Sequence, residues 1–264
     1  GCGIAPDEPF VKTEDDKPKQ VDGTILQKLD PGSYYQTWQM DDGRLVSFSI
    51  FVPPTYDDEN PTPLVLSLHY GPDRMVQFFG HQMLQSMVRP ATKELDAIVI
   101  APDVINKSWL NFRCEECVMA LLQEVTETYN VDQHRVLVVG YSLGAEGAWY
   151  YASKHPDVFT ASIPIAGNPP ADYASMNWSV PMLVIHSKAD EVFPYSVVAE
   201  SVLALERKGV DCIQLYPLEN ISHYESTKFV EPLTQAVTWV KEVWNTNAPP
   251  AEARSESDAS PESK

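Results

Sequence analysis

Residues 140–144 read Gly-Tyr-Ser-Leu-Gly, a Gly-x-Ser-x-Gly pentapeptide at the point where a strand becomes a helix. An apolar run at 136–139 predicts a short buried strand, and residues 145–153 predict the helix that follows it. The turn between them needs glycine on both sides, because the backbone folds tightly and neighbouring side chains must stay clear. The pattern therefore predicts that the hydroxyl of Ser142 is presented at the end of a sheet, where a nucleophile belongs.

An acid and a histidine follow Ser142 along the chain, each in a loop that leaves an apolar strand. Asp190 follows the predicted strand 181–186, and His223 follows the predicted strand 212–217. Because the carboxyl ends of parallel strands meet at one edge of a sheet, these loops are expected to converge. A serine hydroxyl is a poor nucleophile until an imidazole accepts its proton, and a carboxylate orients that imidazole. We therefore predict Ser142 as nucleophile, His223 as general base and Asp190 as its carboxylate partner.

A triad of this kind also needs backbone donors for the oxyanion that develops on the substrate. The residue after the nucleophile usually supplies one of them, here the N–H of Leu143. The second is expected from an early loop that follows a buried strand. The apolar strand 64–69 ends in such a loop, so Tyr70 or Gly71 is the predicted second donor.

The chain from about Pro61 to Trp244 resembles the α/β-hydrolase superfamily. It is most similar to the extracellular esterases in the polyhydroxybutyrate depolymerase-like, feruloyl esterase-like and peptidase-like branch. One departure is Tyr70, because relatives usually have glycine directly after the histidine of the oxyanion loop. The resemblance implies a serine hydrolase that needs no cofactor or metal. It is carried by residues 68–71, 140–144, 151–159, 186–194 and 222–223.

Several residues compete for the same roles. Ser142 could instead be an ordinary helix N-cap between two turn glycines. Asp190 could be a solvated loop charge, with Glu191 or Glu219 in its place. Only His223 follows both Ser142 and the acid in the chain, and two of the other candidates end apolar strands, where we expect scaffold roles. The competing histidines are His69, His81, His155 and His186, of which His69 and His186 end strands.

The order of apolar segments predicts an α/β fold. Asp-Gly between two strand-like runs is a strong hairpin signal, so 34–40 and 44–52 are expected to form an antiparallel hairpin. Strands then alternate with helices, which predicts a mostly parallel sheet with helices on both faces. Residues 167–180 are too few for a large cap domain, so the site is predicted to be open. The expected helices are 77–88, 114–129, 142–153, 195–208 and 226–244.

Aromatic residues in the flanking loops are candidates for substrate binding or for packing onto the core. We select Trp109, because relatives often carry an aromatic residue there, and Tyr141, which precedes the nucleophile. The other aromatic candidates for a stacking surface are Tyr70, Tyr173 and Trp178.

Composition limits the range of partners. The chain has 264 residues and a net charge of −18, with an isoelectric point near 4.6, which argues against nucleic acid. Small-molecule or polymer-linked esters remain suitable substrates. Cys114 and Cys117 are interpreted as a structural pair, either buried or disulfide-bonded, rather than a redox pair or a zinc site.

The two ends of the chain differ from its centre. Residues 1–30 are predicted to be a polar tether, 31–244 the hydrolase domain and 245–264 an acidic tail. Cys2, followed by a hydrophilic stretch, resembles the lipidated cysteine of a bacterial lipoprotein, which implies a membrane tether and a cell-envelope or secreted location.

The sequence thus predicts a serine esterase. The open alternatives are a peptidase or thioesterase with the same triad, and a non-catalytic envelope binding protein on a hydrolase scaffold.

Overall fold

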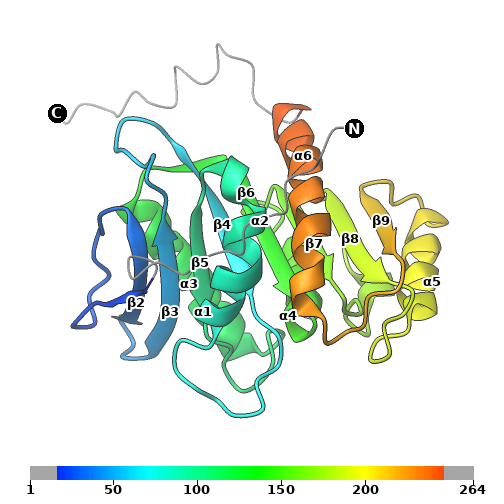
Figure 1. The fold of residues 1–264 in the computed structure, drawn as a ribbon, viewed down its shortest axis with the longest axis horizontal. Helices are drawn as coiled ribbons and strands as arrows, with labels where there is room; N and C mark the ends of the chain where they lie inside the picture. The colour runs from blue at the N-terminus through cyan, green and yellow to red at the C-terminus, as the bar shows by residue number, and fades with distance from the viewer. Residues whose placement is uncertain (1–16, 247–264) are drawn as a thin grey trace, which may run out of the picture.

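The computed structural model describes residues 17–246. Nine strands form one sheet in the order β1-β2-β3-β5-β4-β6-β7-β8-β9, with helices on both faces (Figure 1). From β5 to β9 in this order, all neighbouring strands are parallel. The strands are β1 Lys19–Gln20, β2 Gly32–Gln39, β3 Leu45–Val52, β4 Thr62–Leu68, β5 Ile98–Pro102, β6 Val131–Tyr141, β7 Ala161–Ile165, β8 Met182–Ser187 and β9 Ile213–Leu218.

The helices divide between the two faces and create two separate hydrophobic layers. One layer contains α3, α4 and α5, and the other contains the α1–α2 segment and α6, which lie in front of the sheet in Figure 1. Strand β4, between them, is buried at every position, which explains its continuous apolar run. The helices are α1 Gly80–Met83, α2 Arg89–Ala91, α3 Phe112–Thr128, α4 Leu143–Lys154, α5 Tyr195–Glu206 and α6 Val230–Thr246. The shorter turns are η2 Leu84–Val88, η3 Lys93–Leu95, η4 Tyr173–Ser175 and η5 Ser226–Phe229.

The predicted hairpin is present. Strands β2 and β3 pair antiparallel from Gly32 opposite Val52 to Gln39 opposite Leu45. Gly43 in the connecting turn has a φ of 88°, a left-handed conformation that glycine adopts without strain. Strand β3 then pairs antiparallel with β5, which joins the hairpin to the parallel part of the sheet.

The folded part of the chain begins earlier than the sequence indicated. Strand β1 pairs in parallel with β2, and Leu26 is buried in the core. The backbone N–H of Gln39 donates to the Thr24 carbonyl at 2.8 Å. Residues 17–30 therefore pack on the domain. The prediction of a polar tether that extends to residue 30 is wrong for these residues. Main-chain pairing of a two-residue strand leaves no apolar pattern from which it could be predicted.

Two predictions fall outside the described residues, namely the lipidated Cys2 and most of the acidic tail 245–264. Across residues 17–246, no helix combines the length and apolar character needed to cross a membrane. No group of three or more metal-ligating side chains gathers within the same range.

Cys114 and Cys117 are buried in α3 as free thiols, which is the buried form of the predicted structural pair. Burial raises the pKa of Cys114 to about 11, so its thiol stays protonated at neutral pH. Its sulfur accepts the backbone N–H of Ile105 at 3.4 Å. Cys212, the first residue of the predicted strand 212–217, is half-buried and lies just before β9.

Candidate active site

The connection from β6 to α4 is as sharp as the pentapeptide predicts. Ser142 lies between the two elements with φ 58° and ψ −117°, a conformation that a non-glycine residue rarely adopts. A Cβ atom on Gly140 would lie 1.8 Å from the carbonyl oxygen of Gly144. A Cβ atom on Gly144 would lie 1.8 Å from the carbonyl oxygen of Leu68. Both glycines are therefore required by backbone contact, and the serine is held in a strained position at the sheet edge.

The three residues predicted to act together form a hydrogen-bonded series with His223 at its centre. The Oγ atom of Ser142 is 2.9 Å from Nε2 of His223. The Nδ1 atom of the same ring is 2.9 Å from Oδ2 of Asp190. They come from the loops after β6, β8 and β9, which are parallel strands of one sheet with β7 between β6 and β8. This hydrogen-bond order can carry a proton from the hydroxyl to the imidazole while the carboxylate fixes the ring.

Asp190 is buried and is held by the turn that follows it. Its Oδ1 accepts the backbone N–H groups of Val192 and Phe193 at 2.9 and 2.7 Å, which leaves Oδ2 for His223. Burial alone would raise the pKa of Asp190, but the hydrogen bonds from His223, Phe193 and Val192 outweigh it. The net effect is a pKa below the ordinary value, so the carboxylate remains ionised at neutral pH.

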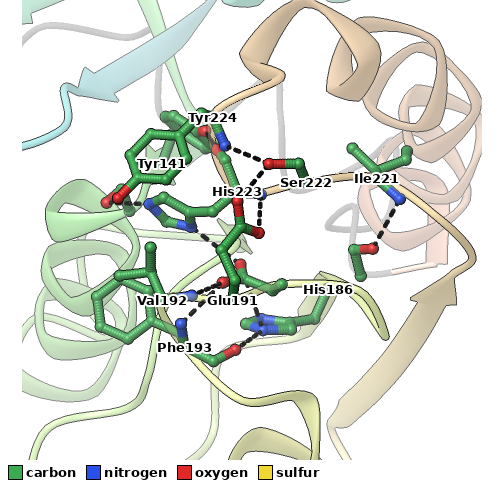
Figure 2. Close-up of polar contacts among 12 residues, drawn as sticks. Tyr141, His186, Glu191, Val192, Phe193, Ile221, Ser222, His223 and Tyr224 are labelled. Atoms are coloured by element: carbon green, nitrogen blue, oxygen red, sulfur yellow. Dashed lines mark hydrogen bonds and ion pairs between the residues drawn. The ribbon is translucent and has the colours of Figure 1, made fainter.

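The imidazole of His223 is enclosed by aromatic side chains (Figure 2). The Tyr141 ring stacks on it with centroids 5.6 Å apart, and the Tyr141 hydroxyl donates to the His223 carbonyl. The Phe193 ring lies beside it with centroids 5.3 Å apart, and the Tyr224 ring meets it edge-on with centroids 5.5 Å apart. Tyr141, predicted to bind substrate, thus holds the histidine as well as lining the cavity.

Glu191 performs a function that the sequence analysis missed. Its Oε2 accepts the backbone N–H of His223 at 2.9 Å, and its Oε1 accepts the Ser222 hydroxyl at 2.5 Å (Figure 2). The two acids that competed for one role therefore have separate roles, because Asp190 binds the ring and Glu191 binds the main chain. Glu219, the other competitor, is exposed and pairs with Lys188.

The predicted oxyanion donors lie together beside Ser142. Leu143 is the first residue of α4, and the first N–H groups of a helix have no partner within it. A Cβ atom on Gly71 would lie 3.7 Å from the Leu143 side chain, so the two loops are in contact. Tyr70 turns its hydroxyl away to Gln82 at 3.0 Å, and all three donors line the same cavity as Ser142.

Residues 75–223, more than half of the chain, match the dienelactone hydrolase family. The chain belongs to the dienelactone hydrolase family. The family lies in the α/β-hydrolase superfamily, so the resemblance found in the sequence is confirmed and made more specific.

Individual relatives are distant. The chain is 25% identical over 151 residues to a protein named Probable feruloyl esterase C from Aspergillus niger, and the match spans 56% of each. The chain therefore covers only about half the length of this curated relative. A solved thermostable esterase has a TM-score of 0.68 at 21% identity, over 80% of this chain and 62% of its own. A solved ferulic acid esterase has a TM-score of 0.65 at 16% identity, over 82% of this chain and 100% of its own. At these identities the two structures show a shared fold.

In this member of the dienelactone hydrolase family, His69 is a scaffold residue, as its place after a strand indicated. Its Nδ1 donates to the Tyr70 carbonyl at 2.6 Å, and its Nε2 accepts the Val104 N–H at 3.1 Å. Burial lowers the pKa of His69 to about 4, so the ring is neutral at neutral pH. His186 is equally buried, and its Nε2 donates to the Phe193 carbonyl at 2.8 Å. Both histidines fix loops that carry site residues.

Trp109 was wrongly predicted to form a pocket wall. Its side chain is fully buried, and its indole Nε1 donates to the His69 carbonyl at 3.0 Å. The ring packs edge-on against His69, and neither side chain lines the cavity. Trp178 also turns inward and packs on Trp149. Loop position indicated an aromatic side chain near the site, but it could not indicate which way that side chain points.

The cavity of this hydrolase-family chain has a volume of about 770 Å³ and opens beside Ser142. Residues 167–180 contribute only the short turn η4 and form no large cap, as predicted. One wall comes from this segment and another from α5. The lining residues are Tyr70, Gly71, Tyr141, Ser142, Leu143, Glu146, Asn168, Pro169, Pro170, Ala171, Tyr173, Val192, Phe193, Val197, Ser201, His223, Tyr224 and Ser226.

Proposed function

We propose that this protein is a serine hydrolase that cleaves carboxylic esters through an acyl-enzyme. The observation that carries the proposal is the continuous hydrogen-bonded series from Asp190 through His223 to Ser142, with 2.9 Å at each step and a cavity at its open end. Membership of a hydrolase family supports the reaction class. The feruloyl esterase name of the curated relative supports an ester as the substrate.

In the acylation half-reaction, the Ser142 oxygen attacks the ester carbonyl while His223 Nε2 accepts the hydroxyl proton. Asp190 stabilises the resulting imidazolium through Nδ1. The Leu143 N–H and an N–H from Tyr70 or Gly71 face the oxyanion. When the tetrahedral intermediate collapses, the imidazolium gives its proton to the departing alcohol, and the acyl group remains on Ser142.

In the deacylation half-reaction, His223 Nε2 removes a proton from water, and the hydroxide attacks the acyl carbonyl. Collapse of the second intermediate returns the proton from His223 to the Ser142 oxygen and releases a carboxylic acid. Protein groups and water supply every proton that moves.

Hydrolysis of p-nitrophenyl esters of short and longer acyl chains tests the proposal. Purified wild type is compared with Ser142→Ala, and Ser175→Ala on an exposed turn is the matched control. We expect Ser142→Ala to lose at least about 10⁴-fold in kcat, and Ser175→Ala to keep wild-type activity. A fluorophosphonate probe should label wild type at Ser142. Absence of both hydrolysis and labelling would contradict the proposal and favour a non-catalytic binding protein.

The same variants separate esterase from peptidase and thioesterase activity, which use the same triad. Matched ester, thioester and amide substrates with one acyl group are compared by kcat/KM. A preference for the amide would reassign the protein as a peptidase, and a preference for the thioester would make it a thioesterase.

A further inference from the structure

Glu146 is a carboxylate in the wall of the cavity, one turn into α4 from Ser142. Among residues 17–246 it has no hydrogen-bond or ion-pair partner, and burial is the sole cause that raises its pKa. An acidic side chain near the start of a helix interacts favourably with the helix dipole, but it does not have to be buried to do so. A half-buried carboxylate without a partner is costly, which points to a partner that arrives with the ligand.

Asn168 is a second residue of the same cavity wall that has an unpaired acceptor. Its Oδ1 atom is buried and has no hydrogen-bond partner among the described residues. Buried side-chain oxygens in native structures are nearly always satisfied, so an orphan that lines a cavity needs an explanation. Asn168 comes from the segment after β7, whereas Glu146 comes from α4, so two independent elements bring residues with unpaired acceptors to one cavity wall.

The remaining charge of the cavity wall favours a positive group. Among the described residues that line it there is neither lysine nor arginine, and Glu146 is their one acidic side chain. The whole chain carries a net charge of −18, so no long-range positive field offsets this carboxylate. An ester with its own carboxylate would meet a like charge and an unpaired acceptor. An ammonium group would supply three donors and the opposite charge.

We propose that Glu146 and Asn168 form a recognition subsite for an ammonium group on the substrate, so that the protein prefers amine-bearing esters to carboxylate-bearing ones. This inference rests on the proposed esterase function, because the subsite would orient the ester carbonyl toward Ser142. The ammonium protons would bind the Glu146 carboxylate and the Asn168 carbonyl oxygen together. Glu146 and Asn168 are thus specificity residues, and the chemical step remains with the triad.

Four carboxylic esters of equal length, which end in an ammonium, hydroxyl, methyl or carboxylate group, test the proposal. The terminal group is placed first on the acyl side and then on the alcohol side, over a range of chain lengths. We expect kcat/KM for the best ammonium ester to exceed that of its methyl counterpart at least about tenfold, and the carboxylate ester to be the poorest. This order reflects opposite-charge attraction and like-charge repulsion in a half-buried site.

Variants assign the preference to the subsite. The quantity compared is the ratio of kcat/KM for the ammonium-terminated ester to kcat/KM for the methyl-terminated ester. Glu146→Gln should abolish this preference, and Asn168→Ala should reduce it. Glu200→Gln removes the same charge from an exposed position of α5 outside the cavity and should leave the ratio unchanged. If Glu200→Gln lowered the ratio as much as Glu146→Gln, the preference would come from net charge, and the subsite would be refuted.

The outcomes also separate this inference from the proposed function. If the methyl-terminated ester is hydrolysed by a reaction that depends on Ser142, and the ammonium-terminated ester is not preferred, the subsite alone would be overturned. A preference for the hydroxyl ester over the ammonium ester would overturn it too, because a neutral donor would then be the ligand. No hydrolysis of any ester, and no labelling of Ser142, would overturn both.

Discussion

The carboxylate of Glu191 accepts the backbone N–H of His223 at 2.9 Å, so the histidine is held by its main chain as well as by its ring. Glu191→Ala should therefore let the loop shift and lower kcat roughly tenfold to a hundredfold with KM unchanged. Glu191→Gln keeps an acceptor oxygen and should restore most of the activity. Steady-state kinetics on a p-nitrophenyl ester, together with the rate of fluorophosphonate labelling, measures both.

Glu219→Ala is the matched control for this positioning role, because Glu219 is an exposed acid in the same region that pairs only with Lys188 in the described contacts. It should behave as wild type. Equal losses in the Glu191 and Glu219 variants would indicate a general effect of charge and would contradict the anchoring role.

The two glycines near the nucleophile should differ sharply in their tolerance of alanine. Gly144→Ala would place a Cβ atom 1.8 Å from the Leu68 carbonyl oxygen, so we expect a loss of more than about 3 kcal/mol in the free energy of unfolding. Gly71→Ala places its Cβ atom 3.7 Å from Leu143, an ordinary contact, and should cost less than about 1 kcal/mol. Urea unfolding measures both values, and equal stabilities would contradict the close approach of α4 to β4.

Trp109 should behave as a core residue. Trp109→Phe keeps an aromatic ring but leaves the buried His69 carbonyl without its indole donor, at a cost of about 1–3 kcal/mol. Because the side chain does not line the cavity, KM for ester substrates should stay at the wild-type value. A raised KM at unchanged stability would restore the pocket-wall role that the sequence suggested.

Asp103 should make stability depend on pH. Burial raises its pKa from 3.8 to about 6, against the hydrogen bonds from Phe78, Gly80 and Phe79. Between these two values the unfolded chain has lost the proton that the folded chain keeps, so this contribution falls as pH rises. Over this pH range, the contribution of Asp103 to the free energy of unfolding should fall by roughly 3 kcal/mol.

The change should appear in wild type and not in Asp103→Asn. Free energies of unfolding in urea are measured for both proteins at several values between about pH 4 and pH 7. As pH rises, the free energy of unfolding of wild type should fall relative to that of Asp103→Asn. Parallel curves would show that Asp103 titrates at its ordinary pKa in the folded protein.

The strands, the sharp turn and the convergence of Ser142, Asp190 and His223 could be predicted because each depends on local pattern or on topology. A Gly-x-Ser-x-Gly turn reports its own backbone, and parallel strands deliver their following loops to one edge. The chain order of the three residues then leaves few arrangements. No long-range detail is needed for any of these inferences.

The features that could not be predicted depend on where a side chain points or on which distant group it meets. Trp109 and Glu191 lie in loops where no periodicity fixes direction, so their contacts with His69 and His223 have no sequence signal. The predicted helix at 77–88 begins only at Gly80, after Phe78 with its φ of 61°. The Asp103 carboxylate binds the N–H groups of Phe78 and Gly80 from another loop.

Part of the cavity wall belongs to segments of the chain that carry none of the three reacting groups. Asn168 and its neighbours follow β7, and Val197 and Ser201 lie on α5, whereas the triad sits in the loops after β6, β8 and β9. On α5, the neighbouring residues Val198 and Val202 pack into the core. Such a division lets part of the ligand preference diverge through replacements on one helix and one connection, while the hydrolytic machinery and the fold are inherited intact.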